Sequence, residues 1–79
     1  MTVERFQQAL NASPFRPFTI HLADGKAIRV VSPEFVSPSP SGRTVIVWQP
    51  DDSMNILDLL LVTNLEVEPS NGQRPRKKR

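Results

Sequence analysis

The stretch Phe18-Thr19-Ile20-His21-Leu22-Ala23-Asp24-Gly25-Lys26-Ala27-Ile28-Arg29-Val30 decides the fold. Its first five residues alternate apolar and polar side chains, as a half-buried strand does. Asp24-Gly25 is a turn signal, and a second apolar-polar alternation follows it. The stretch therefore predicts two antiparallel strands joined by a tight turn.

The length of that turn sets the register of the hairpin. A two-residue Asp24-Gly25 loop would pair Ile20 with Arg29 and mix core with solvent. A three-residue loop, residues 23–25, pairs Ile20 with Ile28 and places Gly25 in the left-handed conformation that such loops require. We expect the longer loop, because a slip of one residue would turn the apolar side chains outward.

A short helix is predicted before the hairpin, from Thr2 to about Ala12. Val3, Phe6 and Leu10 recur on one face, which is the spacing of an amphipathic helix. Thr2 is placed to cap the helix. A helix this short is unstable alone, so its apolar stripe must pack on the sheet.

Short strands and turns follow the hairpin. Residues 32–42 contain three prolines, which forbid a central strand and leave at most a short edge or turn segment anchored by Phe35. Thr44–Trp48 is the strongest strand, with apolar residues on both faces. It is therefore either covered on both sides or open to a partner on one side. Residues 54–57 form the next strand, and residues 62–68 form the last.

These elements predict an α+β domain. It has an N-terminal helix and a strongly bent antiparallel sheet of four or five strands, which form a small open Sm/SH3-like barrel or rolled sheet. Asp58 is expected to cap a tight corner before the last strand. The expected core is one cluster: Phe6, Leu10, Phe18, Ile20, Ile28, Val45, Val47, Ile56, Leu65 and Val67.

The chain of 79 residues predicts one domain over residues 1–69 and a disordered basic tail over 70–79. It has no cysteine and one histidine, which argues against disulfides and a structural zinc site. Its longest apolar run, Leu59–Val62, is far shorter than a membrane span. No secretory signal is visible, so a cytoplasmic location is expected.

Charge is divided sharply along the chain. Five basic residues and eight acidic residues precede the last six, which gives −3, and the last six add +5 to reach the net charge of +2. Such a tail is suited to nucleic acid, to an anionic membrane surface or acidic partner, or to solubility without a specific partner. The candidate nucleic-acid-binding residues are Arg74, Arg76, Lys77, Lys78 and Arg79.

A second candidate site is an apolar interface formed by Trp48, Leu59, Leu60, Leu61 and Val62. Four consecutive apolar residues exceed what one face of a small domain needs. Burial in the core is one explanation, and a homomeric interface is the other. Trp is enriched at interface hot spots, which favours the second.

No group of residues predicts catalysis, a metal site or a cofactor. The sequence nominates no nucleophile or carboxylate beside His21, the single histidine, so a half-exposed strand position accounts for it. Asp51-Asp52 lies in ordinary turn chemistry and lacks further oxygen ligands at fixed spacing. We therefore expect a protein that is not an enzyme and has no small-molecule substrate.

The strings at residues 14–25, 33–35, 39–43 and 56–67 resemble a group of short uncharacterised bacterial proteins. The resemblance covers most of residues 2–68 and implies a bacterial origin, but no activity. The order of elements also resembles the Sm-like layout of a helix followed by five bent strands. The corner Asp58-Leu59-Leu60 lacks the Arg-Gly or Lys-His type motif with which Sm-like rings read RNA.

Taken together, these features predict a small binding or assembly module that engages RNA or DNA through its tail. The alternative is a homo-oligomeric protein-interaction module with no role in nucleic-acid binding.

Overall fold

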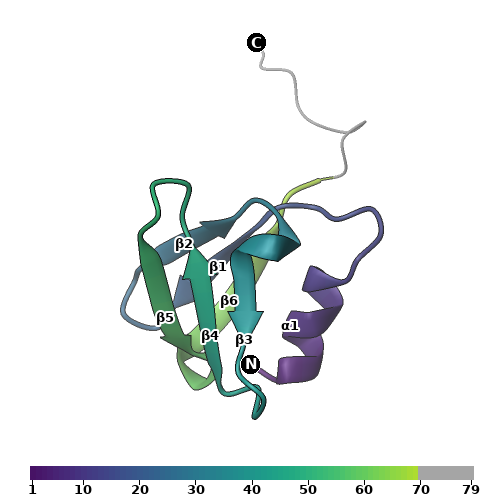
Figure 1. The fold of residues 1–79 in the computed structure, drawn as a ribbon. Coiled ribbons are helices and arrows are strands. Elements are labelled where there is room, and N and C mark those ends of the chain that lie inside the picture. Colours follow the sequence, from purple (N-terminus) through teal and green to yellow (C-terminus); the bar gives the residue numbers. More distant parts are fainter. Residues whose placement is uncertain (70–79) are drawn as a thin grey trace.

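The computed structural model describes residues 1–69, which contain one α-helix and six antiparallel strands in two sheets (Figure 1). The predictions made for residues 70–79 lie outside the described residues. No helix within residues 1–69 has the length and apolar character needed to cross a membrane. In chain order the elements are α1 (Val3–Leu10), β1 (Phe18–Leu22), β2 (Ala27–Val30), the 3-10 turn η1 (Pro33–Phe35), β3 (Val36–Pro38), β4 (Thr44–Trp48), β5 (Met54–Asp58), the 3-10 turn η2 (Leu59–Leu61) and β6 (Val62–Val67).

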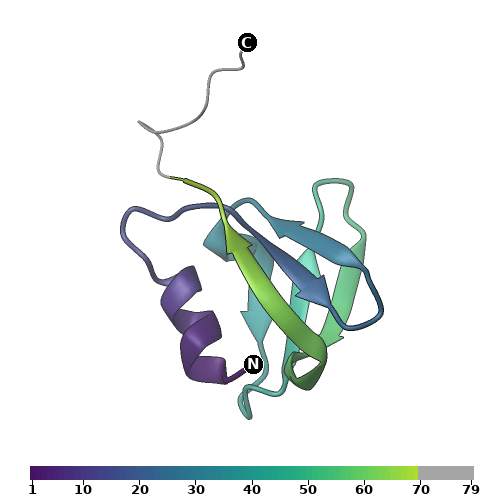
Figure 2. The same ribbon diagram turned by 180° about the vertical axis from the view of Figure 1, so that it is seen from behind.

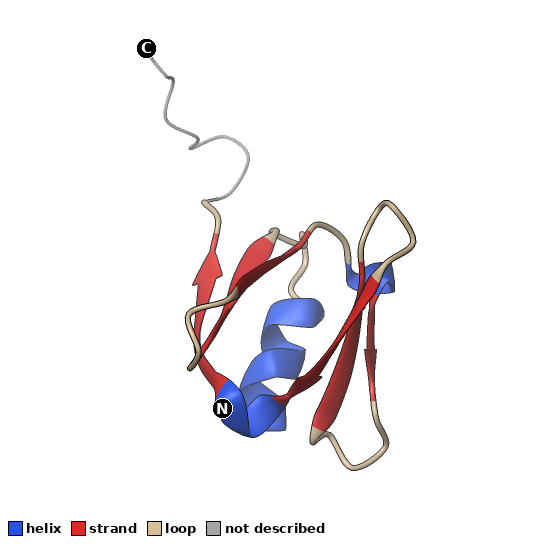
Figure 3. Ribbon diagram, turned by 90° about the vertical axis from the view of Figure 1, so that its left-hand side faces the viewer, coloured by secondary structure: helices blue, strands red, loops and turns tan. Residues whose placement is uncertain are grey.

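The strands form two three-stranded sheets, in the orders β2-β1-β6 and β3-β4-β5. Figure 3 shows the sheets as two layers, and Figures 1 and 2 show α1 at one side of both, next to the edge strands β3 and β6. The α+β class is confirmed. The prediction of one sheet with four or five strands is wrong, and no closed barrel is shown. Pro33 opens η1 between β2 and β3, and a proline cannot donate to a sheet ladder, so pairing stops there.

The register of the first hairpin is as predicted. Ile20 lies opposite Ile28, and Gly25 has a φ of 94°. The Gly25 N–H donates to the Leu22 carbonyl at 2.9 Å, which closes the three-residue loop. This register places the apolar side chains of both strands on the side of the sheet that faces the core.

The core is one cluster between the sheets and the helix. Phe6 of α1 meets Phe18 of β1 edge to face, with ring centroids 5.9 Å apart, and both side chains are fully buried. Thr2 caps the helix as predicted, because its Oγ1 accepts a hydrogen bond from the Arg5 N–H at 3.3 Å. The buried residues are Phe6, Leu10, Phe18, Ile20, Ile28, Val30, Val45, Val47, Leu57, Leu59 and Val62.

Three predicted core positions differ. Ile56 is 63% exposed, and its neighbour Leu57 is buried in its place. The phase of β5 follows from the turn before it, which sets Ile46 opposite Ile56 on the outer face of the sheet. Val67 is 42% exposed and Leu65 is half-buried, because the side chains nearest to them at the end of the helix are the small Ala9 and Ala12.

Candidate interaction surface

The outer face of the β4–β5 pair carries an apolar patch. Ile46 lies directly opposite Ile56, and Trp48 lies opposite Met54. Trp48, Met54 and Ile56 are 42%, 48% and 63% exposed. Side chains that face each other across two antiparallel strands are in contact range, so the four residues form one surface. We call Ile46, Trp48, Met54 and Ile56 the outer patch.

The outer patch is not needed to complete the core. Val45 and Val47 of β4 and Leu57 of β5 point to the opposite face, where all three are buried. Of the two explanations for the apolar faces of Thr44–Trp48, the structure therefore favours the one in which a face stays open. Contiguous exposed apolar patches on small proteins often mark interaction sites.

Polar groups border the outer patch at one end. The Asp58 carboxylate accepts a hydrogen bond from the Leu60 N–H at 2.9 Å, which caps η2 as predicted. Its second oxygen lies 3.6 Å from an Arg43 guanidinium nitrogen. Protein interfaces combine an apolar centre with a polar rim, and the patch has this arrangement.

The structure divides the predicted interface set. Leu59 and Val62 are 2% and 5% exposed and pack in the core, so they are not available to a partner. Leu60 and Leu61 are 65% and 56% exposed on the turn that follows β5. Leu61 lines the same small hollow as Ile56, with a volume of about 190 Å³. This hollow extends the outer patch toward η2.

His21 has a carboxylate partner that was not predicted. Its Nε2 lies 2.9 Å from Oε1 of Glu66, across the β1–β6 pair. This contact could have been predicted only from the pairing of the first strand with the last, because that pairing brings together two residues that are 45 positions apart in the sequence. The two atoms are within hydrogen-bond distance, so the contact links the side chains of β1 and β6 on the exposed face of the sheet.

The acid pair at the β4–β5 turn acts locally. Asp51 accepts hydrogen bonds from the Ser53 hydroxyl at 2.6 Å and from the Ser53 N–H at 3.0 Å. The side-chain bond from Ser53, and then its backbone bond, lower the pKa of the Asp51 carboxyl below its ordinary value. Within the part of the chain that the structure describes, no three His, Asp or Glu side chains gather as metal ligands would.

The candidate nucleic-acid residues, Arg74, Arg76, Lys77, Lys78 and Arg79, lie outside the described residues. Comparison of the chain with family models, curated proteins and solved structures found no match.

Proposed function

We propose that this protein is a small assembly module that associates with a second copy of itself through the outer patch. The observation that carries this proposal is the exposure of Trp48, Met54 and Ile56 on a sheet whose other face already completes the core. Large aromatic anchors with a polar rim are the usual energetic centre of an interface.

The proposed interface must extend beyond the outer patch to η2. Stable interfaces bury about 1,200–2,000 Å² in total. We therefore include Leu60 and Leu61 in the proposed contact, because both are exposed and Leu61 lines the same hollow as Ile56.

Mass measurement tests the proposal. By light scattering, the wild-type chain should be a dimer or larger, and Trp48→Ser should be a monomer at the same concentration. Val31→Ser is the matched control, because Val31 is 36% exposed and lies outside the outer patch. Equal masses for wild type and Trp48→Ser would reject the outer patch as the interface.

A second function, nucleic-acid binding through the tail, is supported by the division of charge. The residues before the tail carry −3, so a polyanion would be drawn to the five basic residues of the tail rather than to the domain. Such binding depends on phosphate neutralisation and is largely independent of sequence. The two functions are compatible, because the outer patch and the tail occupy different parts of the chain.

A further inference from the structure

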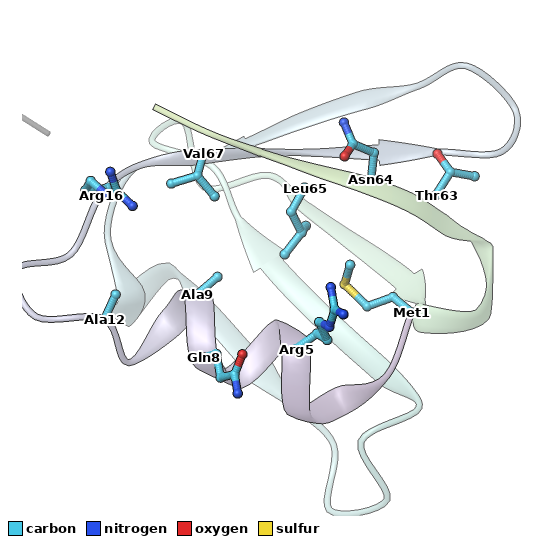
Figure 4. Close-up of a pocket in the computed structure, with 10 residues that line it drawn as sticks. All are labelled: Met1, Arg5, Gln8, Ala9, Ala12, Arg16, Thr63, Asn64, Leu65 and Val67. Carbon is cyan, nitrogen blue, oxygen red and sulfur yellow. The ribbon is translucent and has the colours of Figure 1, made fainter. Parts of the chain in front are cut away.

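A groove of about 440 Å³ lies between α1 and β6, on the side of the molecule away from the outer patch. Figure 4 shows that Ala9 of α1 and Ala12 on the loop after it line one side, while Leu65 and Val67 of β6 line the other. Leu65 and Val67 pair with the buried Ile20 and Phe18 and share their face of the sheet. They are nevertheless partly exposed, because the two alanines opposite them have only methyl groups.

The backbone of β6 is unpaired on the groove side. β6 is an edge strand in the order β2-β1-β6. The Glu68 N–H donates to the Pro17 carbonyl, so these two residues form a hydrogen-bonded pair. Such pairs recur at every second residue of an antiparallel ladder, and the next one is Glu66 opposite Thr19. In this alternation, the N–H and C=O groups of Leu65 and Val67 point away from β1. Among the described residues, none forms a hydrogen bond with these groups on that side.

The charge around the groove is positive. Arg5 lies toward its Met1 end and Arg16 toward its Val67 end (Figure 4). Neither arginine forms an ion pair within residues 1–69. Glu66 of β6 and Glu68 just after it lie on the opposite face, where Glu66 bonds His21 and Glu68 bonds Arg29. The groove therefore lacks an acidic partner for its two guanidinium groups.

We propose that this groove binds an extended acidic peptide segment of a partner protein, which adds as a further strand beside β6. The free N–H and C=O groups of Leu65 and Val67 would form the ladder. Leu65, Val67 and Ala9 would contact alternate apolar side chains, and Arg5 and Arg16 would pair with acidic ones at the two ends. Addition of a strand to an exposed sheet edge is a recurring mode of peptide recognition, and the charge of the groove selects an acidic segment.

Binding is tested on the full chain with the fluorescein-labelled heptapeptide Glu-Ser-Val-Ser-Val-Ser-Glu, whose first, third, fifth and seventh side chains share one face of a strand and so place Val in the middle of the groove and Glu at its two ends. Fluorescence anisotropy should show binding that weakens at least tenfold in Arg5→Glu/Arg16→Glu. Lys26→Glu/Arg43→Glu is the control of equal charge change and should bind nearly as wild type does. The heptapeptide Lys-Ser-Val-Ser-Val-Ser-Lys, which places Lys beside Arg5 and Arg16, should not bind. Equal loss in both double variants, or equal binding of both peptides, would overturn the proposal.

Two measurements locate the peptide. Amide hydrogen exchange at Leu65 and Val67 should slow at least fivefold when the peptide is bound. Two peptides N-methylated on alternate residues should differ, because only one set of amides faces β6; one should bind and the other should not. Unchanged exchange at both amides, or equal binding of the two methylated peptides, would contradict strand addition.

The basic tail is the competing source of attraction for an acidic peptide. A full chain in which the five basic residues from Arg74 to Arg79 are replaced by Ser should still bind and still show the protection at Leu65 and Val67. Loss of binding in that variant, with Arg5→Glu/Arg16→Glu unaffected, would overturn the proposal. The proposal would also be overturned if oligo-dT slowed hydrogen exchange at Leu65 and Val67 and the acidic peptide did not. Trp48→Ser should bind the peptide normally, which separates this site from self-association.

Discussion

At the scale of single residues, two glycines with positive φ have different surroundings. Gly25 has a φ of 94° and no heavy atom within 4 Å of the position that a Cβ would occupy. Gly42 has a φ of 77°, and its Cβ would lie 2.7 Å from Cγ2 of Val3 at the start of α1. Gly42 therefore holds the turn before β4 against the helix, whereas Gly25 serves only the conformation of its loop.

Gly25→Ala should lower the free energy of unfolding by about 1–2 kcal/mol, the cost of a left-handed L-residue. Gly42→Ala should lower the free energy of unfolding by roughly 1–3 kcal/mol more than Gly25→Ala does, because the added methyl group overpacks against Val3. Denaturant unfolding measures both values. In a chain that already carries Val3→Ala, Gly42→Ala should cost little more than Gly25→Ala does, because the clash is removed. Equal losses of stability for Gly25→Ala and Gly42→Ala in the wild-type chain would contradict the contact with Val3.

The stability of the fold should depend on pH through the Asp51 carboxyl. Its pKa is lowered in the folded chain, chiefly by the Ser53 hydroxyl. The ionised form is therefore favoured by folding. Its contribution is present above the unfolded pKa and is lost as the pH falls through the lower folded pKa. In an NMR titration, Ser53→Ala should raise the pKa of Asp51 toward its ordinary value. An unchanged midpoint would show that the Ser53 hydroxyl is not the cause.

At the scale of elements, α1 is attached to the sheets through Phe6 and Leu10. Phe6→Ala should lower the free energy of unfolding by about 3–5 kcal/mol, because the side chain is fully buried against Phe18. Small domains have only about 5–15 kcal/mol in total. Gln7→Ala, on the exposed side of the same helix, is the control and should change stability by less than about 0.5 kcal/mol. A similar small loss for Phe6→Ala would show that the helix is not docked through this residue.

The elements that were predicted correctly from the sequence are those in which a single residue or a simple alternation determines the register. Gly25 and the alternation from Phe18 to Leu22 fixed the first hairpin, and Asp58 fixed the corner before β6. The phase of β5 was not readable in the same way, because Ile56 and Leu57 are adjacent and both apolar. The turn that sets the phase uses Asp52 at a φ of 75°, which is uncommon for a residue other than glycine.

The candidate sites were predictable to different degrees. Trp48 was named from its residue type, but Met54 and Ile56 were not, because they join it only through strand pairing. Leu60 and Leu61 could not be separated from Leu59 and Val62 by composition, since the direction of each side chain depends on the geometry of η2. The α1–β6 groove depends on which strand lies at the sheet edge, and local sequence patterns do not give that order.

At the scale of the whole molecule, the tail predicts salt-dependent binding. If five phosphates are neutralised, the affinity for duplex DNA should fall with salt at a log–log slope of about −4.5. Fluorescence anisotropy with labelled DNA measures this slope. A chain that ends at Pro69 should lose the binding and keep the fold. Unchanged binding by the shortened chain would point instead to the basic residues of the domain.

Self-association through the outer patch is tested most directly by the emission of Trp48. The chain has one tryptophan and no tyrosine, so its fluorescence comes from the centre of the proposed interface. On dilution, the emission maximum should shift to longer wavelength as Trp48 enters water, and the molecular mass should fall over the same concentration range. A constant emission maximum together with a single-chain mass at every concentration would contradict the account.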